Sequence, residues 1–126
     1  MRFIFLLLIS GTLYAQDPVA PVQAQLDAYN KRDIEAFLKP YSDSVAVYFF
    51  PNRLLYKGKE TMRKEYADMF TNTPDLHCTL KSRMIIGNTI IDEESVIFNK
   101  NSPTLHAAAI YKVEKGLIVA VYFVGE

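Results

Sequence analysis

Residues 104–124, TLHAAAIYKVEKGLIVAVYFV, decide the fold class of this chain. They form two runs rich in β-branched and aromatic residues, 104–113 and 117–124, separated by Glu114-Lys115-Gly116. Strand-forming runs on either side of a short Gly-containing turn are typical of a β-hairpin. We therefore expect the chain to end in a pair of antiparallel strands.

Three more strands are predicted upstream of this hairpin. Residues 76–86 and 89–98 flank Gly87-Asn88, which is typical of a two-residue hairpin turn, and residues 45–50 form an aromatic, β-branched run. Alternation in 76–86 predicts one dry face and one wet face. The expected dry face holds Leu76, Cys78, Leu80, Met84 and Ile86, and the expected wet face holds His77, Thr79, Lys81 and Arg83.

The first half of the chain predicts three helices. Apolar residues recur at helical spacing from Val22 to Tyr29, with Gln25 on the same stripe. Asp33 is suited to cap a short helix that Pro40 ends, and residues 59–70 form the third helix. Helices followed by strands predict an α+β fold, in which the helices cover one face of a curved, mostly antiparallel sheet.

The first fifteen residues are expected to be removed from the mature protein. Met1-Arg2 gives a positive start, Phe3 to Ile9 is an apolar run, and Leu13-Tyr14-Ala15 precedes a predicted cleavage site. This arrangement is typical of a signal peptide, and the run is too short to span a bilayer. We expect an exported protein, periplasmic or secreted, with a signal peptide at 1–15, a leader at 16–21 and one domain at 22–126.

Charge and cysteine content exclude several kinds of partner. The chain has 14 basic and 14 acidic residues, and removal of Arg2 leaves 13 against 14, so no net field favours nucleic acid.

Cys78 is the single cysteine, so an internal disulfide is impossible, and its place in the alternation predicts a small buried side chain. No Gly-rich phosphate loop and no metal-ligand spacing is present, so neither a cofactor nor a metal is expected.

Three segments in order resemble one superfamily. They are YNKRDIEAF at 29–37, YKGKE at 56–60 and AIYKVEKGLIV at 109–119. Together they resemble the nuclear transport factor 2-like superfamily, in its ketosteroid isomerase and polyketide cyclase (SnoaL-like) branch. The resemblance covers residues 22–126 and implies a cone-shaped pocket and a possible homodimer formed through the outer face of the sheet.

The resemblance also implies where an isomerase would carry its active groups. The tyrosine of the first helix falls on Gln25, the carboxylate base on Phe50, and the acid donor on or beside Ala109. None of these residues can perform the corresponding role. Steroid isomerase chemistry by that mechanism is therefore not expected.

Asp92 and Glu94 are the candidate acids of this chain. They share a strand face with Ile90, Val96 and Phe98 by period-two geometry. Two interpretations stay open. Either at least one acid points inward, where desolvation would raise its pKa for general acid or base chemistry, or a β-bulge or a sheet edge turns all three acids at 92–94 to water. Gln25 has two interpretations as well: it donates to a ligand oxygen, or it caps a neighbouring backbone group or lies at the edge of the stripe.

The aromatic side chains predict the walls of a pocket. Eight Tyr and eight Phe suit a small hydrophobic or ring-shaped ligand, although they can equally fill a core. The strand at 104–113 does not reveal its inner face by pattern, and the resemblance favours Ala107, Ala109 and Tyr111 over His106. The candidate ligand-binding residues are Gln25, Tyr29, Tyr48, Phe50, Tyr66, Ala109, Tyr111 and Tyr122.

Three functions are consistent with these features. The first is a module that binds a small apolar molecule without catalysis. The second is an isomerase, cyclase or dehydratase that uses Asp92 or Glu94. The third is an interaction module whose pocket is filled by its own side chains.

Overall fold

A computed structural model of the protein describes residues 16–126. The predicted signal peptide, residues 1–15, lies outside the described residues. Within the described part the helices are α1 (Val19–Lys31), α2 (Ile34–Leu38) and α3 (Lys59–Asn72). The strands are β1 (Tyr41–Phe49), β2 (Arg53–Lys57), β3 (His77–Ile86), β4 (Thr89–Ile97), β5 (Leu105–Glu114) and β6 (Leu117–Gly125).

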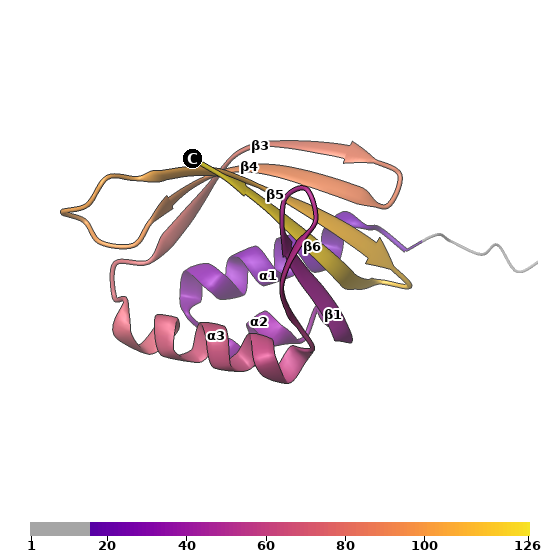
Figure 1. Cartoon of the computed structure of the whole chain (residues 1–126), viewed down its shortest axis with the longest axis horizontal. Helices are drawn as coiled ribbons and strands as arrows, with labels where there is room; N and C mark the ends of the chain where they lie inside the picture. The colour runs from indigo at the N-terminus through magenta and orange to yellow at the C-terminus, as the bar shows by residue number, and fades with distance from the viewer. Residues whose placement is uncertain (1–15) are drawn as a thin grey trace, which may run out of the picture.

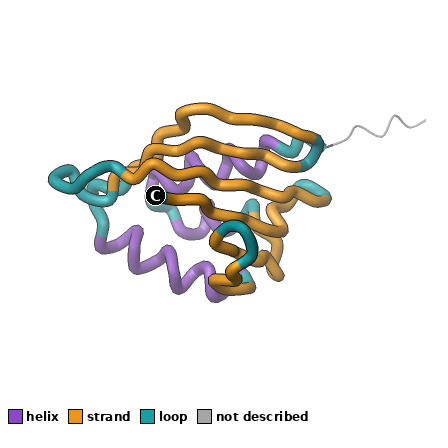
Figure 2. Tube along the Cα trace, turned by 45° about the horizontal axis from the view of Figure 1, so that its top comes forward, coloured by secondary structure: helices purple, strands orange, loops and turns teal. Residues whose placement is uncertain are grey.

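The strands form one sheet in the order β2-β1-β6-β5-β4-β3. Neighbouring strands are antiparallel except for β1 and β6, which are parallel. The helices lie together on one side of this sheet (Figure 1). The sheet curves over them as a single layer (Figure 2). The predicted α+β class, with helices from the N-terminal half covering a mostly antiparallel sheet, is confirmed.

Two helix starts illustrate how the sequence sets local structure. α1 begins at Val19 rather than at the expected Val22, with Pro18 as its N-cap and Pro21 in its first turn. Prolines are tolerated there because the first backbone N–H groups of a helix have no partner within it. α2 begins as predicted after Asp33, whose side chain accepts a hydrogen bond from the Ala36 backbone N–H at 3.2 Å.

Strand β2 was not predicted from the sequence. Its five residues, Arg53–Lys57, are mostly exposed, so they show no alternation between polar and apolar positions. β2 is an edge strand that pairs only with β1 in the part of the chain that the structure describes. Edge strands of this kind leave little signal in sequence, because neither face is consistently buried.

A bulge in β3 changes which side chains face the helices. The pairing of β3 with β4 shifts between Leu80 and Ser82, so Lys81 is the extra residue. An extra residue reverses the facing of every residue that follows it. The predicted alternation is therefore wrong beyond Leu80: Met84 and Ile86 are exposed, and Arg83 lies inside.

The core lies between the helices and the inner face of the sheet. Its fully buried side chains include Val22, Phe37, Met62, Ile90 and Val121, which come from both layers. No helix within residues 16–126 has both the length and the apolar character needed to cross a membrane.

Candidate functional site

A cavity of about 230 Å³ opens between the helices and the inner face of the sheet. Aromatic rings from every layer line it, together with a few aliphatic side chains and one carboxylate. The lining residues are Leu26, Tyr29, Tyr41, Phe49, Tyr66, Met69, Cys78, Glu94, Val96, Phe98, Leu105, Ala107, Tyr111, Phe123, Val124 and Gly125. The cone is therefore not completely filled by its own side chains.

Glu94 is the carboxylate in this wall. It lies on β4 between Glu93 and Ser95 and is 7% exposed. Burial, followed by the negative charge of Asp92, raises the pKa of the Glu94 carboxyl from its ordinary value of 4.5 to about 7. A carboxyl with a pKa near neutrality can both accept and donate a proton at physiological pH.

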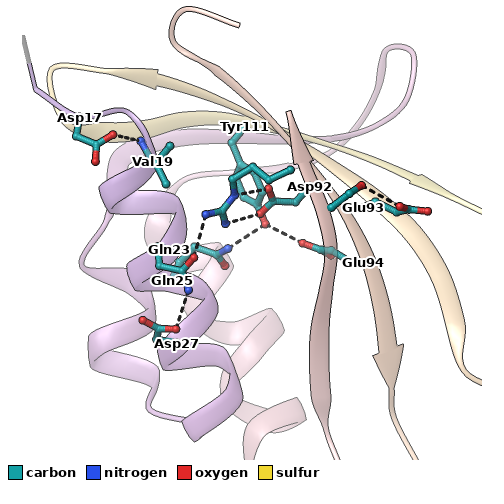
Figure 3. A network of polar contacts seen from close by, with 11 residues as sticks. Asp17, Val19, Gln23, Gln25, Asp27, Asp92, Glu93, Glu94 and Tyr111 are labelled. Carbon is teal, nitrogen blue, oxygen red and sulfur yellow. Dashed lines mark hydrogen bonds and ion pairs between the residues drawn. The ribbon is translucent and has the colours of Figure 1, made fainter. Parts of the chain in front are cut away.

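A chain of hydrogen bonds from β1 and α1 reaches Glu94. The Tyr41 hydroxyl donates to Gln25 Oε1 at 3.1 Å, and Gln25 Nε2 donates to the Tyr111 hydroxyl oxygen at 3.0 Å. The Tyr111 hydroxyl then donates to Glu94 Oε1 at 3.5 Å. Figure 3 shows the Gln25 side chain and the Glu94 carboxylate approaching the Tyr111 hydroxyl from opposite sides.

The Gln25 side chain lies inside the core, between two tyrosine hydroxyls. It is 4% exposed and satisfies two tyrosine hydroxyls rather than a backbone group or the cavity. A buried amide needs such partners, because an unsatisfied polar group in the core costs about 1–3 kcal/mol. Its role is to orient Tyr41 and Tyr111, both of which line the cavity.

Asp92 lies beside Glu94 but has a different environment. It is completely buried, and both of its carboxylate oxygens accept hydrogen bonds from Arg83, at 2.7 Å from Nε and 2.9 Å from Nη2. Arg83 Nη1 also donates to Gln23 Oε1 on α1 at 2.9 Å. The interpretation that a bulge turns these acids to water is wrong, because both Asp92 and Glu94 are buried. Glu93, between them, is exposed and pairs with His106.

The sequence of residues 22–121 matches the SnoaL-like domain family. The chain belongs to this family. A comparison with curated proteins gives no match.

Solved structures similar to this SnoaL-like domain establish its fold. A cystatin-fold protein from Novosphingobium aromaticivorans is 22% identical, with a TM-score of 0.78 over 87% of this chain and 99% of that one. An NTF2-like protein from Cytophaga hutchinsonii is 16% identical, with a TM-score of 0.73 over 91% and 95%. An LEH-like epoxide hydrolase of M. tuberculosis is 13% identical, with a TM-score of 0.73 over 86% and 82%.

The SnoaL-like domain brings some of the candidate ligand-binding residues together and excludes others. Tyr29, Tyr66 and Tyr111 line the cavity. Ala109 faces inward beside Asp92 on the neighbouring strand, but it is fully buried behind the cavity wall. The inner face of β5 is the one that holds Ala107, Ala109 and Tyr111, and His106 lies on the exposed outer face.

The remaining candidates, Tyr48, Phe50 and Tyr122, lie outside the cavity lining. Tyr48 and Tyr122 are paired across β1 and β6, and their rings stack at 4.7 Å with an interplanar angle of 9°. Tyr122 does not form part of the predicted pocket wall, because its neighbours Val121 and Phe123 take the inner face: Val121 is buried in the core and Phe123 lines the cavity. Phe50 follows the end of β1 and is 49% exposed.

Several residues of the site, among them Tyr41, Phe49, Phe123 and Arg83, were not identified from the sequence. Phe49 and Phe123 were missed because residues 45–49 of β1 and most of β6 are apolar on both faces, so a period of two cannot distinguish their sides. Arg83 was placed on the wet face because nothing in the sequence marks the bulge at Lys81. No group of His, Cys, Asp and Glu side chains within residues 16–126 is arranged to hold a metal ion.

Proposed function

We propose that this SnoaL-like domain binds a small apolar, ring-shaped molecule in its aromatic cavity and exchanges a proton with that molecule through Glu94. The observation that carries the proposal is a buried carboxyl in an apolar wall, where desolvation raises its pKa to about 7. Perturbed carboxyls inside clefts are common among catalytic acids and bases. The description of one structural neighbour as an epoxide hydrolase is consistent with an enzyme on this fold.

The reaction class that fits is proton transfer, as in isomerisation, cyclisation or dehydration. Ionised Glu94 would take a proton from the substrate, and protonated Glu94 would return it. Tyr29 can donate to a substrate oxygen, because it lines the cavity and its hydroxyl makes no side-chain hydrogen bond within residues 16–126. Burial raises the pKa of the Tyr29 hydroxyl far above 10, so it stays protonated as a donor.

Deuterium uptake by a small ketone tests this proposal. In D2O we expect the purified protein to accelerate exchange at the methyl group of acetophenone, with a rate that rises with pH and levels off above about 7. Because a positioned base contributes roughly 10²- to 10⁴-fold, E94Q should lower the rate at least 100-fold. E93Q is the matched control, since Glu93 lies on the same strand but outside the cavity. Equal rates for E94Q and E93Q would contradict the proposal.

Binding without catalysis is the second candidate function. It is favoured by the absence of isomerase groups at Gln25, Phe50 and Ala109, where the family resemblance implies them. A carrier of this kind would bind acetophenone with no exchange above the rate of the buffer. The exchange assay and a binding titration on the same sample therefore distinguish the two candidates.

We also propose that residues 1–15 direct export to the periplasm or the medium. The support is the order of features along the segment: the positive charge of Arg2, the apolar run from Phe3 to Ile9, and a small residue, Ala15, at the predicted cleavage site. Expression of the full chain in a bacterial host should yield a processed protein that begins at Gln16. N-terminal sequencing of the cytoplasmic and exported fractions tests this, and an intact Met1 in the exported protein would contradict it.

Self-association through the outer face of the sheet is a further part of the proposal. The stacked rings of Tyr48 and Tyr122 are partly exposed on the face opposite to the cavity. Sedimentation equilibrium should give a dimer for the wild type and a weaker dimer for Y122S. A monomeric wild type at high micromolar concentration would exclude this arrangement.

A further inference from the structure

When Glu94 is ionised, the cavity wall carries a negative charge that no ion pair compensates. Arg83 directs Nε and Nη2 to Asp92 and Nη1 to Gln23, so its positive charge is shared with Asp92. Glu94 takes part in none of the ion pairs formed within residues 16–126. The buried charges Asp92, Arg83 and ionised Glu94 therefore sum to one negative charge, and that charge is the one at the cavity.

Burial of a carboxylate without a neighbouring cation is energetically unfavourable, because desolvation disfavours its ionised form. The side chains that face Glu94 offer hydroxyls and a thiol rather than a second cation. The titratable and charged groups around it are Asp92 on its own strand, Arg83 and Cys78 on β3, Tyr111 on β5, Tyr41 on β1, Tyr29 on α1 and Tyr66 on α3. A positive group in the cavity would supply the missing charge.

The rest of the wall suits the same kind of ligand. Aromatic rings attract cations through their negative faces, and tyrosine is among the rings used for this purpose. Tyr29, Tyr41, Tyr66 and Tyr111 line the cavity together with Glu94. A volume of about 230 Å³ exceeds the roughly 150 Å³ of an engineered cavity that holds benzene, so one ring with a short substituent fits.

The cavity has a polar inner end and an apolar mouth. Phe49, Phe98 and Val124 are well exposed and form its rim, whereas Glu94 and Tyr111 are buried. A ligand with a charged end and a ring would therefore enter with the charged end toward Glu94. Its ring would remain among the aromatic and aliphatic side chains nearer the mouth.

We propose that the molecule bound in this cavity is a small cyclic or aromatic amine whose protonated nitrogen lies against the Glu94 carboxylate. The inference rests on the proposed function, because it takes the same cavity as the ligand site and names the class of ligand. An ammonium group beside Glu94 would also keep this residue ionised at neutral pH.

The sign of the pH dependence distinguishes an amine from a neutral ligand. Ammonium binding requires ionised Glu94, so the affinity should rise with pH through about 7. A neutral ring of the same shape removes water from the carboxyl without supplying a charge, which favours protonated Glu94. Its affinity should therefore stay constant or fall over the same range.

Benzylamine and benzyl alcohol are the matched probes for this test. Isothermal titration of the purified protein at pH 5.5 and 8.5 should show benzylamine binding roughly 30-fold tighter at the higher pH, because the ionised fraction of a group with a pKa of about 7 rises by that factor. Benzyl alcohol should show no such gain. E94Q should weaken benzylamine binding at pH 8.5 and abolish its pH dependence, while binding of benzyl alcohol persists. E93Q should behave as the wild type.

The possible failures of this experiment have different meanings. If benzyl alcohol binds but benzylamine binds no more tightly at pH 8.5 than at pH 5.5, the amine inference is overturned and the proposed ligand cavity stands. The inference is likewise overturned if E94Q keeps the pH dependence. If neither probe binds the wild type, the proposed ligand cavity is overturned as well.

Discussion

Arg83 binds both carboxylate oxygens of the completely buried Asp92, at 2.7 and 2.9 Å, from a position that follows a β-bulge. This pair fixes β3 to β4 and, through Gln23, to α1. Because the pair is buried, its two partners are expected to depend strongly on one another.

Removal of Arg83 alone should destabilise the protein severely. R83L leaves the buried Asp92 carboxylate without its partner, and such a loss typically costs 3–5 kcal/mol, that is, about 4 kcal/mol here. Urea unfolding at pH 7 measures it. The double variant R83L/D92L should recover most of the loss, because an apolar pair needs no compensating charge. K81L, at the exposed extra residue of the bulge, is the control. Additive losses in R83L, D92L and the double variant would contradict this coupling.

Glu94 should make the protein less stable as the pH rises from about 4.5 to 7. The folded protein holds the Glu94 proton up to about pH 7, whereas the unfolded chain releases it near 4.5. In that window the folded state binds more protons, so the free energy of unfolding falls with pH, by about 3 kcal/mol in total. Above about pH 7 this contribution stays constant.

E94Q should remove that fall and be more stable than the wild type at pH 8. Urea unfolding at pH 4.5, 6, 7 and 8 measures the difference between the two proteins. The pKa of His106 is raised by its hydrogen bonds to Glu93 and Glu126, so its contribution to the free energy of unfolding also falls as the pH rises. Because His106 is present in both proteins, this contribution cancels in the difference between them. E114Q, at an exposed acid on β5, should follow the wild type. A constant difference between wild type and E94Q across the range would contradict the buried, proton-binding Glu94.

Tyr111 and Tyr41 should affect Glu94 differently. The Tyr111 hydroxyl donates to Glu94 and favours its ionised form, so Y111F should raise the pKa of Glu94 further. Y41F removes a hydroxyl that bonds to Gln25 rather than to Glu94, so it should move this pKa much less. Titration of the carboxyl ¹³C signal of Glu94 by NMR measures both shifts. Equal shifts in the two variants would contradict the hydrogen-bond order from Tyr41 to Glu94.

Asn30, in α1, should stabilise the position of the edge strand β3. Its Nδ2 donates to the Cys78 carbonyl at 2.9 Å, and its Oδ1 accepts from the Cys78 backbone N–H at 2.8 Å. N30A removes both bonds from partly buried groups and should cost about 2 kcal/mol of unfolding free energy. N30D keeps the acceptor for the Cys78 N–H but places a carboxylate oxygen against the Cys78 carbonyl oxygen, so at pH 7 it should cost at least as much. N52A, in the exposed turn after β1, is the control, and a loss no larger than that of N52A would contradict this role.

The sequence by itself determined most of the helices and strands and the fold family. The start of α2 after Asp33, the turns at Gly87-Asn88 and Lys115-Gly116, and the strand-rich second half all follow from interactions between residues close in the chain. Such interactions depend on side-chain type and backbone preference, which a sequence states directly. The three segments that resemble the SnoaL-like branch indicated the family, which the match at 22–121 confirms.

Only the tertiary structure decided which side chains form the site. The bulge at Lys81 placed Arg83 inside, and the parallel pairing of β1 with β6 placed Phe123 in the wall and Tyr122 outside. The chemistry of Glu94 arises from burial by residues of α1, β3 and β5 and from the neighbouring charge of Asp92. These properties depend on distances between residues far apart in the chain, because desolvation and ion pairing act through space, so local sequence patterns do not record them.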